Sequence, residues 1–178
     1  MILKFMRASA PSRSTECLLP AAADGRVEGI YLGLRRGELP VSVAEAEAIP
    51  GHGLAGDRYW SGAGTWSHWP GAGREVTLIA AEVLDRLPPA CRLSAAEARR
   101  NLVTRGVDLN ALVGRDFRVG PVWLRGQRLC EPCAHLERLT RPGVAAALVG
   151  RGGLRADILA GGRIRAGDVL ACGRFEPA

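Results

Sequence analysis

Lysine is almost absent from this sequence of 178 residues, since Lys4 is the only lysine and arginine supplies every other basic side chain. A Walker phosphate loop requires a lysine directly after its glycines, and no such loop precedes Lys4. A pyridoxal-phosphate enzyme requires a lysine in its pocket to form the Schiff base. We expect residues 1–24 to form a flexible tail, so the position of Lys4 argues against both classes, including a pyridoxal-phosphate desulfurase.

Long apolar runs and a regular cysteine pattern are also missing. No stretch approaches the ~20 apolar residues of a membrane-spanning helix, and the N-terminus lacks the continuous apolar region of a secretory signal. An odd, scattered set of cysteines argues against a disulfide framework, and its members are Cys17, Cys91, Cys130, Cys133 and Cys172. The sequence therefore predicts a cytoplasmic protein with reduced thiols and no membrane partner.

Aromatic side chains are scarce, at 5% of the sequence, and the net charge of +6 comes from arginines spread along the chain. So few aromatic side chains offer little surface on which nucleobases could stack, and the arginines form no concentrated basic stripe. The composition therefore disfavours a nucleic-acid partner. Arginine guanidinium groups nevertheless suit phosphate, carboxylate and other oxyanion ligands. The length and a hydrophobic fraction of 47% are typical of one domain with a single core.

Short runs of alternating apolar and polar residues, separated by glycine and proline, predict strands along most of the chain. The expected strands are 27–32, 39–43, 74–80, 101–104, 117–119, 122–129, 154–159 and 168–172. Short helices are expected over 81–87, 94–100, 133–139 and 144–149, with a helical turn at 109–113. Residues 50–73 are rich in glycine and tryptophan, which is typical of a functional loop. Many short strands with few short helices indicate a β-rich barrel.

Residues 51–56, GHGLAG, match the G-x-G-x-x-G dinucleotide fingerprint. That fingerprint must follow a strand and open a helix, whereas here Pro50 precedes it and a glycine-rich loop follows. We therefore interpret the segment as a turn whose glycines adopt positive φ angles.

Cys130 and Cys133 form a C-x-x-C motif. A zinc site would need two more ligands, and His52, His68 and His135 stand at no recognised spacing. A thioredoxin-like site would need a βαβ context, which the pattern lacks. Two interpretations stay open from the residues alone: a reactive thiol at Cys133, near the start of a helix, or a pair of buried core thiols.

Arginine, asparagine and threonine are concentrated in residues 99–106, where an expected helix gives way to a strand. These donors could hold a phosphate or the edge of a pterin, and the alternative is a solvated, charged turn. Asp57 and Arg58 could form a salt bridge that fixes the preceding loop. Arg58 could instead face an anionic ligand.

Taken in order, several segments resemble the MOSC domains, which are named for the C-terminal domain of molybdenum-cofactor sulfurases. These segments are residues 56–59, 74–79, 100–109, 114–120 and 129–136. The resemblance implies a β-rich α+β fold, specifically a MOSC-type β-barrel with short peripheral helices. It also implies a single domain over residues 25–178.

The resemblance further implies a site built around one cysteine, which falls on Cys133, with Cys130 as an accessory. Cys133 would be a persulfide site or a thiolate ligand to molybdenum, both of which suit a soft, nucleophilic sulfur. The implied cofactor is the molybdenum cofactor, molybdopterin, whose pyranopterin carries a phosphate. The implied cofactor-binding residues are Arg58, Arg74, Arg100, Asn101, Thr104 and His135.

Three functions follow from this resemblance and from the composition. The first is a protein that binds molybdenum cofactor or carries sulfur on Cys133, with a cysteine desulfurase supplying the sulfur in trans. The second is a molybdenum-dependent reductase of N-hydroxylated compounds, which would need an electron-transfer partner and a small-molecule substrate. The third is a non-catalytic module that binds an anion or RNA. Whether the protein is an enzyme stays open at this level.

Overall fold

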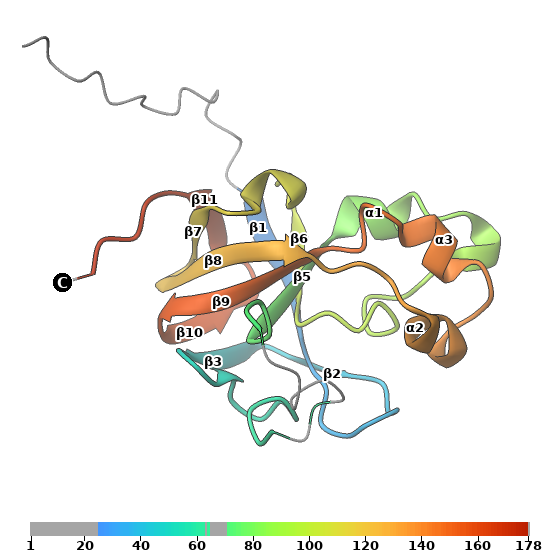
Figure 1. Ribbon diagram of the computed structural model, residues 1–178, viewed down its shortest axis with the longest axis horizontal. Helices are drawn as coiled ribbons and strands as arrows, with labels where there is room; N and C mark the ends of the chain where they lie inside the picture. Colours follow the sequence, from blue (N-terminus) through green and yellow to red (C-terminus); the bar gives the residue numbers. More distant parts are fainter. Residues whose placement is uncertain (1–24, 63, 65–70, 178) are drawn as a thin grey trace, which may run out of the picture.

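A computed structural model describes residues 25–62, 64 and 71–177 of the chain. The expected tail over residues 1–24, together with Cys17 and His68, lies outside the described residues. Within the described part, seven strands close into a barrel, because β1 pairs with β11 as well as with β6 (Figure 1). In barrel order these strands are β11 (Val169–Cys172), β7 (Asp116–Val119), β8 (Val122–Leu129), β9 (Leu154–Ala160), β5 (Val76–Ala80), β6 (Leu102–Arg105) and β1 (Gly25–Leu32).

Neighbouring strands of the barrel run antiparallel, except that β5 and β6 are parallel, with Leu78 opposite Leu102. The strand β2 (Val41–Val43) extends the sheet from β1. A second sheet is formed by β10 (Gly162–Arg165), β3 (Glu45–Ile49) and β4 (Gly53–Leu54). The β-rich barrel that the sequence predicts is therefore confirmed.

The strands β3 and β10 were not expected from the sequence. β3 alternates glutamate with alanine, and both residue types are depleted in strands. The alternation nevertheless directs Ala46 and Ala48 inward, where they are 6% and 1% exposed and pack against the barrel core. The period-two alternation of β3 is typical of a strand, but the weak strand propensity of alanine and glutamate made this pattern hard to recognise.

The barrel interior is filled by the inward-facing residues of successive strands. Burial alternates along β1 and β8, and the largest fully buried side chains of this cluster include Phe117, Leu124, Leu154 and Ile164. Burying one such side chain contributes about 2 kcal/mol, so this cluster is the main source of stability.

Three short helices gather at one end of the barrel: α1 (Ala81–Asp85), α2 (Ala134–Leu139) and α3 (Val144–Leu148) (Figure 1). With the 3₁₀ turn η1 (Pro89–Cys91), they cover a second hydrophobic cluster that includes Leu136 and Val144 from the helices. Ile79 and Val103 join it from β5 and β6. Another 3₁₀ turn, η2 (Asn110–Leu112), precedes β7. No helix in the described ranges is long and apolar enough to cross a membrane.

The helix expected over residues 94–100 is a single turn. Its capping box is present: the Ser94 N–H donates to Glu97 Oε2 at 2.8 Å, and the Glu97 N–H donates to Ser94 Oγ at 3.2 Å. The turn ends because Arg99 adopts a left-handed backbone conformation, with φ 58°. This abrupt end directs residues 99–101 toward the site described below.

The glycine-rich segment 51–56 forms a turn and the strand β4, with no helix among the described residues that follow it. Gly51, Gly53 and Gly56 have φ angles of 79°, 96° and 86°, as the turn interpretation predicts. The dinucleotide interpretation is therefore excluded by the local backbone.

Candidate functional site

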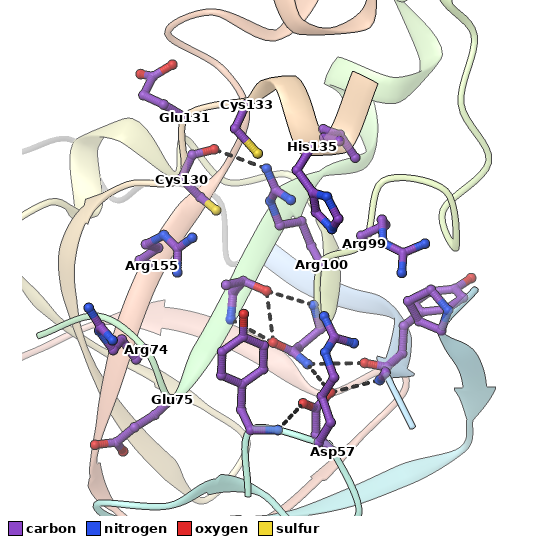
Figure 2. A pocket seen from close by; sticks show the side chains of 18 residues that line it. Asp57, Arg74, Glu75, Arg99, Arg100, Cys130, Glu131, Cys133, His135 and Arg155 are labelled. Atoms are coloured by element: carbon purple, nitrogen blue, oxygen red, sulfur yellow. Dashed lines mark hydrogen bonds between the residues drawn. The ribbon is translucent and has the colours of Figure 1, made fainter. Parts of the chain in front are cut away.

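A cavity lies at the end of the barrel where the helices gather. It is lined by residues from β1 and β5, the turn after β4, the segment before β6, the C-X-X-C segment and α2. The cavity therefore draws on parts of the chain that are far apart in sequence. Figure 2 shows its side chains converging from these separate elements.

One wall of the cavity is a polar network centred on Asn101. Its Oδ1 accepts hydrogen bonds from the Thr77 N–H at 3.1 Å and from Thr77 Oγ1 at 2.8 Å. Its Nδ2 donates to the Tyr31 carbonyl at 3.3 Å and to Asp57 Oδ2 at 3.2 Å. Asn101 therefore uses its side-chain hydrogen-bonding groups to hold protein segments together.

Asp57 completes this network. This residue is only 6% exposed. Besides the hydrogen bond from Asn101, its carboxylate accepts hydrogen bonds from the Gly33 N–H at 2.8 Å and from the Tyr59 N–H at 2.9 Å. Asp57 thus joins the turn after β4 to the end of β1. The salt bridge that the sequence suggested between Asp57 and Arg58 is not among the ion pairs of the described residues.

Arg100 has a similar structural role. Its guanidinium donates from Nε to the Gly152 carbonyl at 3.0 Å, from Nη1 to the Ala98 carbonyl at 3.1 Å and from Nη2 to the Cys130 carbonyl at 3.1 Å. The residue is 8% exposed. Arg100 also lines the cavity. Its three hydrogen bonds fix three backbone segments around the guanidinium.

A second wall is cationic. Arg58 packs over the Tyr59 ring, with 5.2 Å between its Cζ and the ring centroid, and its buried Nε has no hydrogen-bond partner among the described residues. Burial lowers the pKa of Arg99, and the nearby charge of Arg58 lowers it further. Burial also lowers the pKa of His135 below its usual 6.5, and surrounding arginines, including Arg138 and Arg99, add to that effect. These shifts report a positive potential on this side of the cavity.

A second group of arginines faces the cavity from the opposite side, where Figure 2 shows Arg74 and Arg155. Arg155 lies on β9, paired with Thr77 of β5. Burial lowers the pKa of neighbouring Arg128, as do the charges of Arg155 and Arg74. The cavity is therefore lined by guanidinium groups on both sides.

The acidic residues that line the cavity do not neutralise these arginines. Asp57 is held by backbone N–H groups, Glu75 accepts from the Ile158 N–H at 2.9 Å, and Glu131 accepts from the Gly150 N–H at 3.0 Å. Within the described ranges, no carboxylate forms an ion pair with Arg58, Arg99 or Arg155. Such an arrangement suits an anionic ligand.

Two cysteines line the same cavity. Cys133 is exposed and immediately precedes α2, whereas Cys130 is 2% exposed and follows β8. Figure 2 shows both sulfur atoms directed toward the cavity. No group of three or more histidine, cysteine and acidic side chains within the described ranges could hold a metal ion by itself.

The structure brings together six of the seven residues expected at the site: Arg58, Arg74, Arg100, Asn101, Cys133 and His135. Thr104 does not line the cavity. It is fully buried on β6, and its Oγ1 donates to the Ile79 carbonyl at 3.4 Å across the parallel pair of β5 and β6. Its expected contact with a cofactor is therefore corrected: strand pairing occupies the hydroxyl and solvent cannot reach it.

Two arginines at the cavity were not in the expected set. Arg99 stands in the basic turn that the sequence indicates, next to Arg100, and its Nη2 donates to the Glu38 carbonyl at 2.6 Å. Arg155 carries no local signal, because it lies within an ordinary strand. Only the pairing of β9 with β5 brings it to the cavity.

The fold is that of a barrel protein with a cationic, thiol-bearing cavity at one end. The MOSC domain profile matches residues 67–171, which is more than half of the sequence, so the chain belongs to the MOSC domain family. No curated protein sequence gives a significant match.

Three solved structures share the fold. YuaD from Bacillus subtilis has a TM-score of 0.70 at 16% identity, covering 86% of this chain and 97% of YuaD. YiiM from Escherichia coli has a TM-score of 0.61 at 18% identity, covering 86% of this chain and 72% of YiiM. YiiM from Geobacillus stearothermophilus has a TM-score of 0.61 at 15% identity, with coverages of 84% and 75%. At these identities the likeness concerns the fold.

Proposed function

We propose that this protein binds the molybdenum cofactor in its arginine-lined cavity and carries sulfur for it on Cys133. The family is associated with binding of this cofactor, which is a pyranopterin that bears a phosphate. The observation that carries the proposal is a cavity that combines an exposed thiol with Arg58, Arg99 and Arg155, which form no ion pair with a carboxylate of the described residues.

The residues present fit the cofactor. The buried Arg58 Nε, which has no hydrogen-bond partner in the part of the chain that the structure describes, is a donor that a phosphate or pterin oxygen would satisfy. Arg99 and Arg155 would supply further charge-assisted hydrogen bonds to the anion. An anion bound beside Arg58 and Arg99 would also relieve the repulsion between these two arginines, which adds to burial in lowering the pKa of Arg99.

The network of Asp57, Asn101 and Thr77 would hold the cavity in shape while the ligand exchanges. Arg100 would fix the end of β8 and so set the position of the cysteine segment. When bound, the cofactor would supply the metal and its redox chemistry. The chain itself would supply the anion-binding wall and the thiol of Cys133.

In the sulfur-carrier role, Cys133 would receive a sulfane sulfur from a persulfide of the cysteine desulfurase class, acting in trans. The thiol is exposed, so a protein donor can reach it. A thiolate can accept sulfur in this way because it is a soft nucleophile. Because Lys4 is the only lysine of the sequence, the desulfurase chemistry itself would be supplied by another protein.

The proposal is tested by measuring molybdenum and pterin in protein purified from a host that makes the cofactor. The variants are Cys133→Ser and, as a matched control, Cys172→Ser, which replaces an exposed cysteine on β11 outside the cavity. We expect pterin in the parent and in Cys172→Ser. Protein that carries no pterin, from a host whose other molybdoenzymes are loaded, would overturn cofactor binding.

The variant Cys133→Ser separates the role of the thiol from the binding of the cofactor. If Cys133 carries sulfur, this variant keeps its pterin and molybdenum but takes up no label from a desulfurase and ³⁵S-cysteine. If molybdenum is lost from this variant alone, Cys133 is a metal ligand, as the reductase alternative requires. Assays with N-hydroxylated compounds and an electron donor would then follow.

A further inference from the structure

Cys130 is the feature of the cavity that cofactor binding leaves unexplained. Its side chain is nearly inaccessible, yet it belongs to neither hydrophobic cluster of the described residues and lines the cavity beside Cys133. Cofactor binding or carriage of one sulfur atom requires a single thiol. A second thiol in the same cavity, separated from the first by two residues, points to chemistry between the two sulfur atoms.

The backbone of Cys130 is held in place from three directions. Its N–H donates to the Gly153 carbonyl at 2.7 Å, and its carbonyl accepts from Arg100 Nη2 at 3.1 Å. Gly152 lies directly behind, since a Cβ at that position would be 2.5 Å from the Cys130 carbonyl oxygen and 3.1 Å from Pro132 Cδ. The backbone of Cys130 is therefore fixed, so Cys133, which is exposed and immediately precedes α2, is the residue that would have to approach it.

The surroundings of Cys130 are cationic. Figure 2 shows Arg155 and Arg74 on the side of the cavity to which the Cys130 sulfur is directed. Burial lowers the pKa of Arg128, and Arg155 adds to that shift, whereas a negative charge on Cys130 acts against it. A hydrosulfide anion leaving the cavity would therefore be attracted by the same arginines that would attract an anionic cofactor.

We propose that Cys130 is the resolving thiol of a sulfur-transfer cycle, so that the cavity releases the sulfur carried by Cys133 as hydrosulfide. This proposal rests on the sulfur-carrier function proposed above and deepens it. In the first step, the Cys133 thiolate attacks the outer sulfur of a donor persulfide. The S–S bond of the donor breaks, the donor leaves as a thiolate, and Cys133 carries a terminal –SH sulfur.

In the second step, the Cys130 thiolate attacks the Cys133 sulfur. The bond from Cys133 to the outer sulfur breaks, and the outer sulfur leaves with the electron pair and its proton as HS⁻. The new bond is a disulfide between Cys130 and Cys133. The outer sulfur gains two electrons and the two cysteines together lose two, so no external oxidant is needed. A small dithiol reductant restores both thiols by exchange and itself becomes a disulfide.

The test uses the full-length, reduced protein and inorganic polysulfide as the sulfur donor. After alkylation and trypsin digestion, cleavage at Arg128 and Arg138 leaves both cysteines on one peptide, residues 129–138. We expect the wild-type peptide to become a disulfide, about 2 Da lighter than the dithiol. Once excess polysulfide has been removed from the loaded protein, one hydrosulfide should be released per disulfide formed. We expect Cys130→Ser to keep an adduct of about 32 Da on Cys133 at least ten times longer than the wild type.

Three further variants make the result specific. Cys133→Ser should form neither the adduct nor the disulfide, and Cys172→Ser should behave like the wild type. Cys130→Ala, which keeps a small apolar side chain, should reproduce Cys130→Ser and exclude an effect of a misplaced hydroxyl. Circular dichroism should show that all of these variants are folded.

Two results would overturn the proposal. One is loss of the Cys133 adduct at the same rate in the wild type, Cys130→Ser and Cys130→Ala. The other is a wild-type disulfide formed without release of hydrosulfide, which would indicate direct oxidation. Pterin content measured in the same preparations distinguishes the two proposals, because cofactor binding can persist when the persulfide is not resolved.

Discussion

The two walls of the cavity have opposite chemical organisation. On the wall formed by Asp57, Asn101 and Thr77, the side-chain groups accept or donate hydrogen bonds within the protein. On the wall formed by Arg58 and Arg99, the guanidinium groups face one another without a carboxylate partner among the described residues. A residue that lines a cavity is thus not necessarily available to a ligand.

This difference separates residues that build the site from residues that bind at it. Removing part of the hydrogen-bonded wall should cost stability, because buried donors lose their acceptors. Removing part of the cationic wall should cost binding and little stability, because no ion pair with a carboxylate of the described residues is lost.

The largest effect is expected for Asp57→Ala. This change leaves the Gly33 N–H, the Tyr59 N–H and the Asn101 amide without their acceptor and should lower the free energy of unfolding by about 3 kcal/mol. Urea denaturation measures it. The control is Glu45→Ala, which removes exposed ion pairs to Arg163 and Arg165 and should cost less than about 1 kcal/mol. Equal losses in both variants would remove the distinction between the walls.

Arg58→Ala should weaken anion binding about tenfold, which corresponds to about 1.4 kcal/mol, and leave stability nearly unchanged. Calorimetric titration with inorganic pyrophosphate measures the affinity. The matched control is Arg163→Ala, because this arginine is exposed on β10 and pairs with Glu45. Equal affinity in Arg58→Ala and Arg163→Ala would contradict the assignment of Arg58 to the binding wall.

Gly33→Ala tests the position of Arg58 without removing its charge. A Cβ at residue 33 would lie 2.1 Å from Arg58 Nη1, so the flexible guanidinium must move aside. We expect a severalfold loss of pyrophosphate affinity, smaller than for Arg58→Ala. The double variant with Arg58→Ala should bind no more weakly than Arg58→Ala alone. Additive losses would mean that Gly33 acts independently of Arg58.

Arg99→Gly should change stability and binding in opposite directions. The left-handed backbone at residue 99 suits glycine, so relief of strain should raise the free energy of unfolding by less than about 1 kcal/mol. The loss of the hydrogen bond to the Glu38 carbonyl offsets part of that gain. The loss of the guanidinium should weaken pyrophosphate binding. Thermal denaturation and titration measure the two effects, and unchanged binding would exclude Arg99 from the cationic wall.

The smallest effect concerns His135, whose pKa is lowered by burial and by nearby arginines. Because the unfolded chain binds a proton at a higher pH than the folded chain, stability should fall as the pH drops below 6.5 and level off below the lowered pKa. Comparing melting temperatures of the wild type and His135→Gln across this range isolates the effect. The same protonation should strengthen anion binding, and parallel melting profiles would contradict this account.

Much of the barrel was predictable because its strands carry strong local patterns. β1 and β8 alternate apolar and polar residues along their length, and turns with glycine or proline bound them. β3 was not predictable in the same way, since alanine and glutamate do not indicate a strand. Its burial depends on pairing with β10, which is far away in the sequence.

The candidate site was predictable to the extent that a family resemblance grouped its residues. No local pattern indicates that Arg58 and His135 are neighbours, because closure of the barrel and packing of α2 bring them together. The structural roles of Asn101 and Arg100 could not be predicted, since most of their hydrogen-bond partners belong to segments that are far away in the sequence. Thr104 was misplaced because the parallel pairing that buries its hydroxyl has no signature in the sequence.

The central claim is that Arg58 and Arg99, which form no ion pair with a carboxylate of the described residues, make up the wall that binds the anionic cofactor. The most direct test is the pterin content of wild type, Arg58→Ala and Arg163→Ala purified from a host that makes the cofactor, read as fluorescence of the oxidised pterin. We expect the wild type and Arg163→Ala to carry equal amounts of pterin and Arg58→Ala to have lost most of it. Equal pterin in all three proteins, or none in the wild type, would contradict the claim.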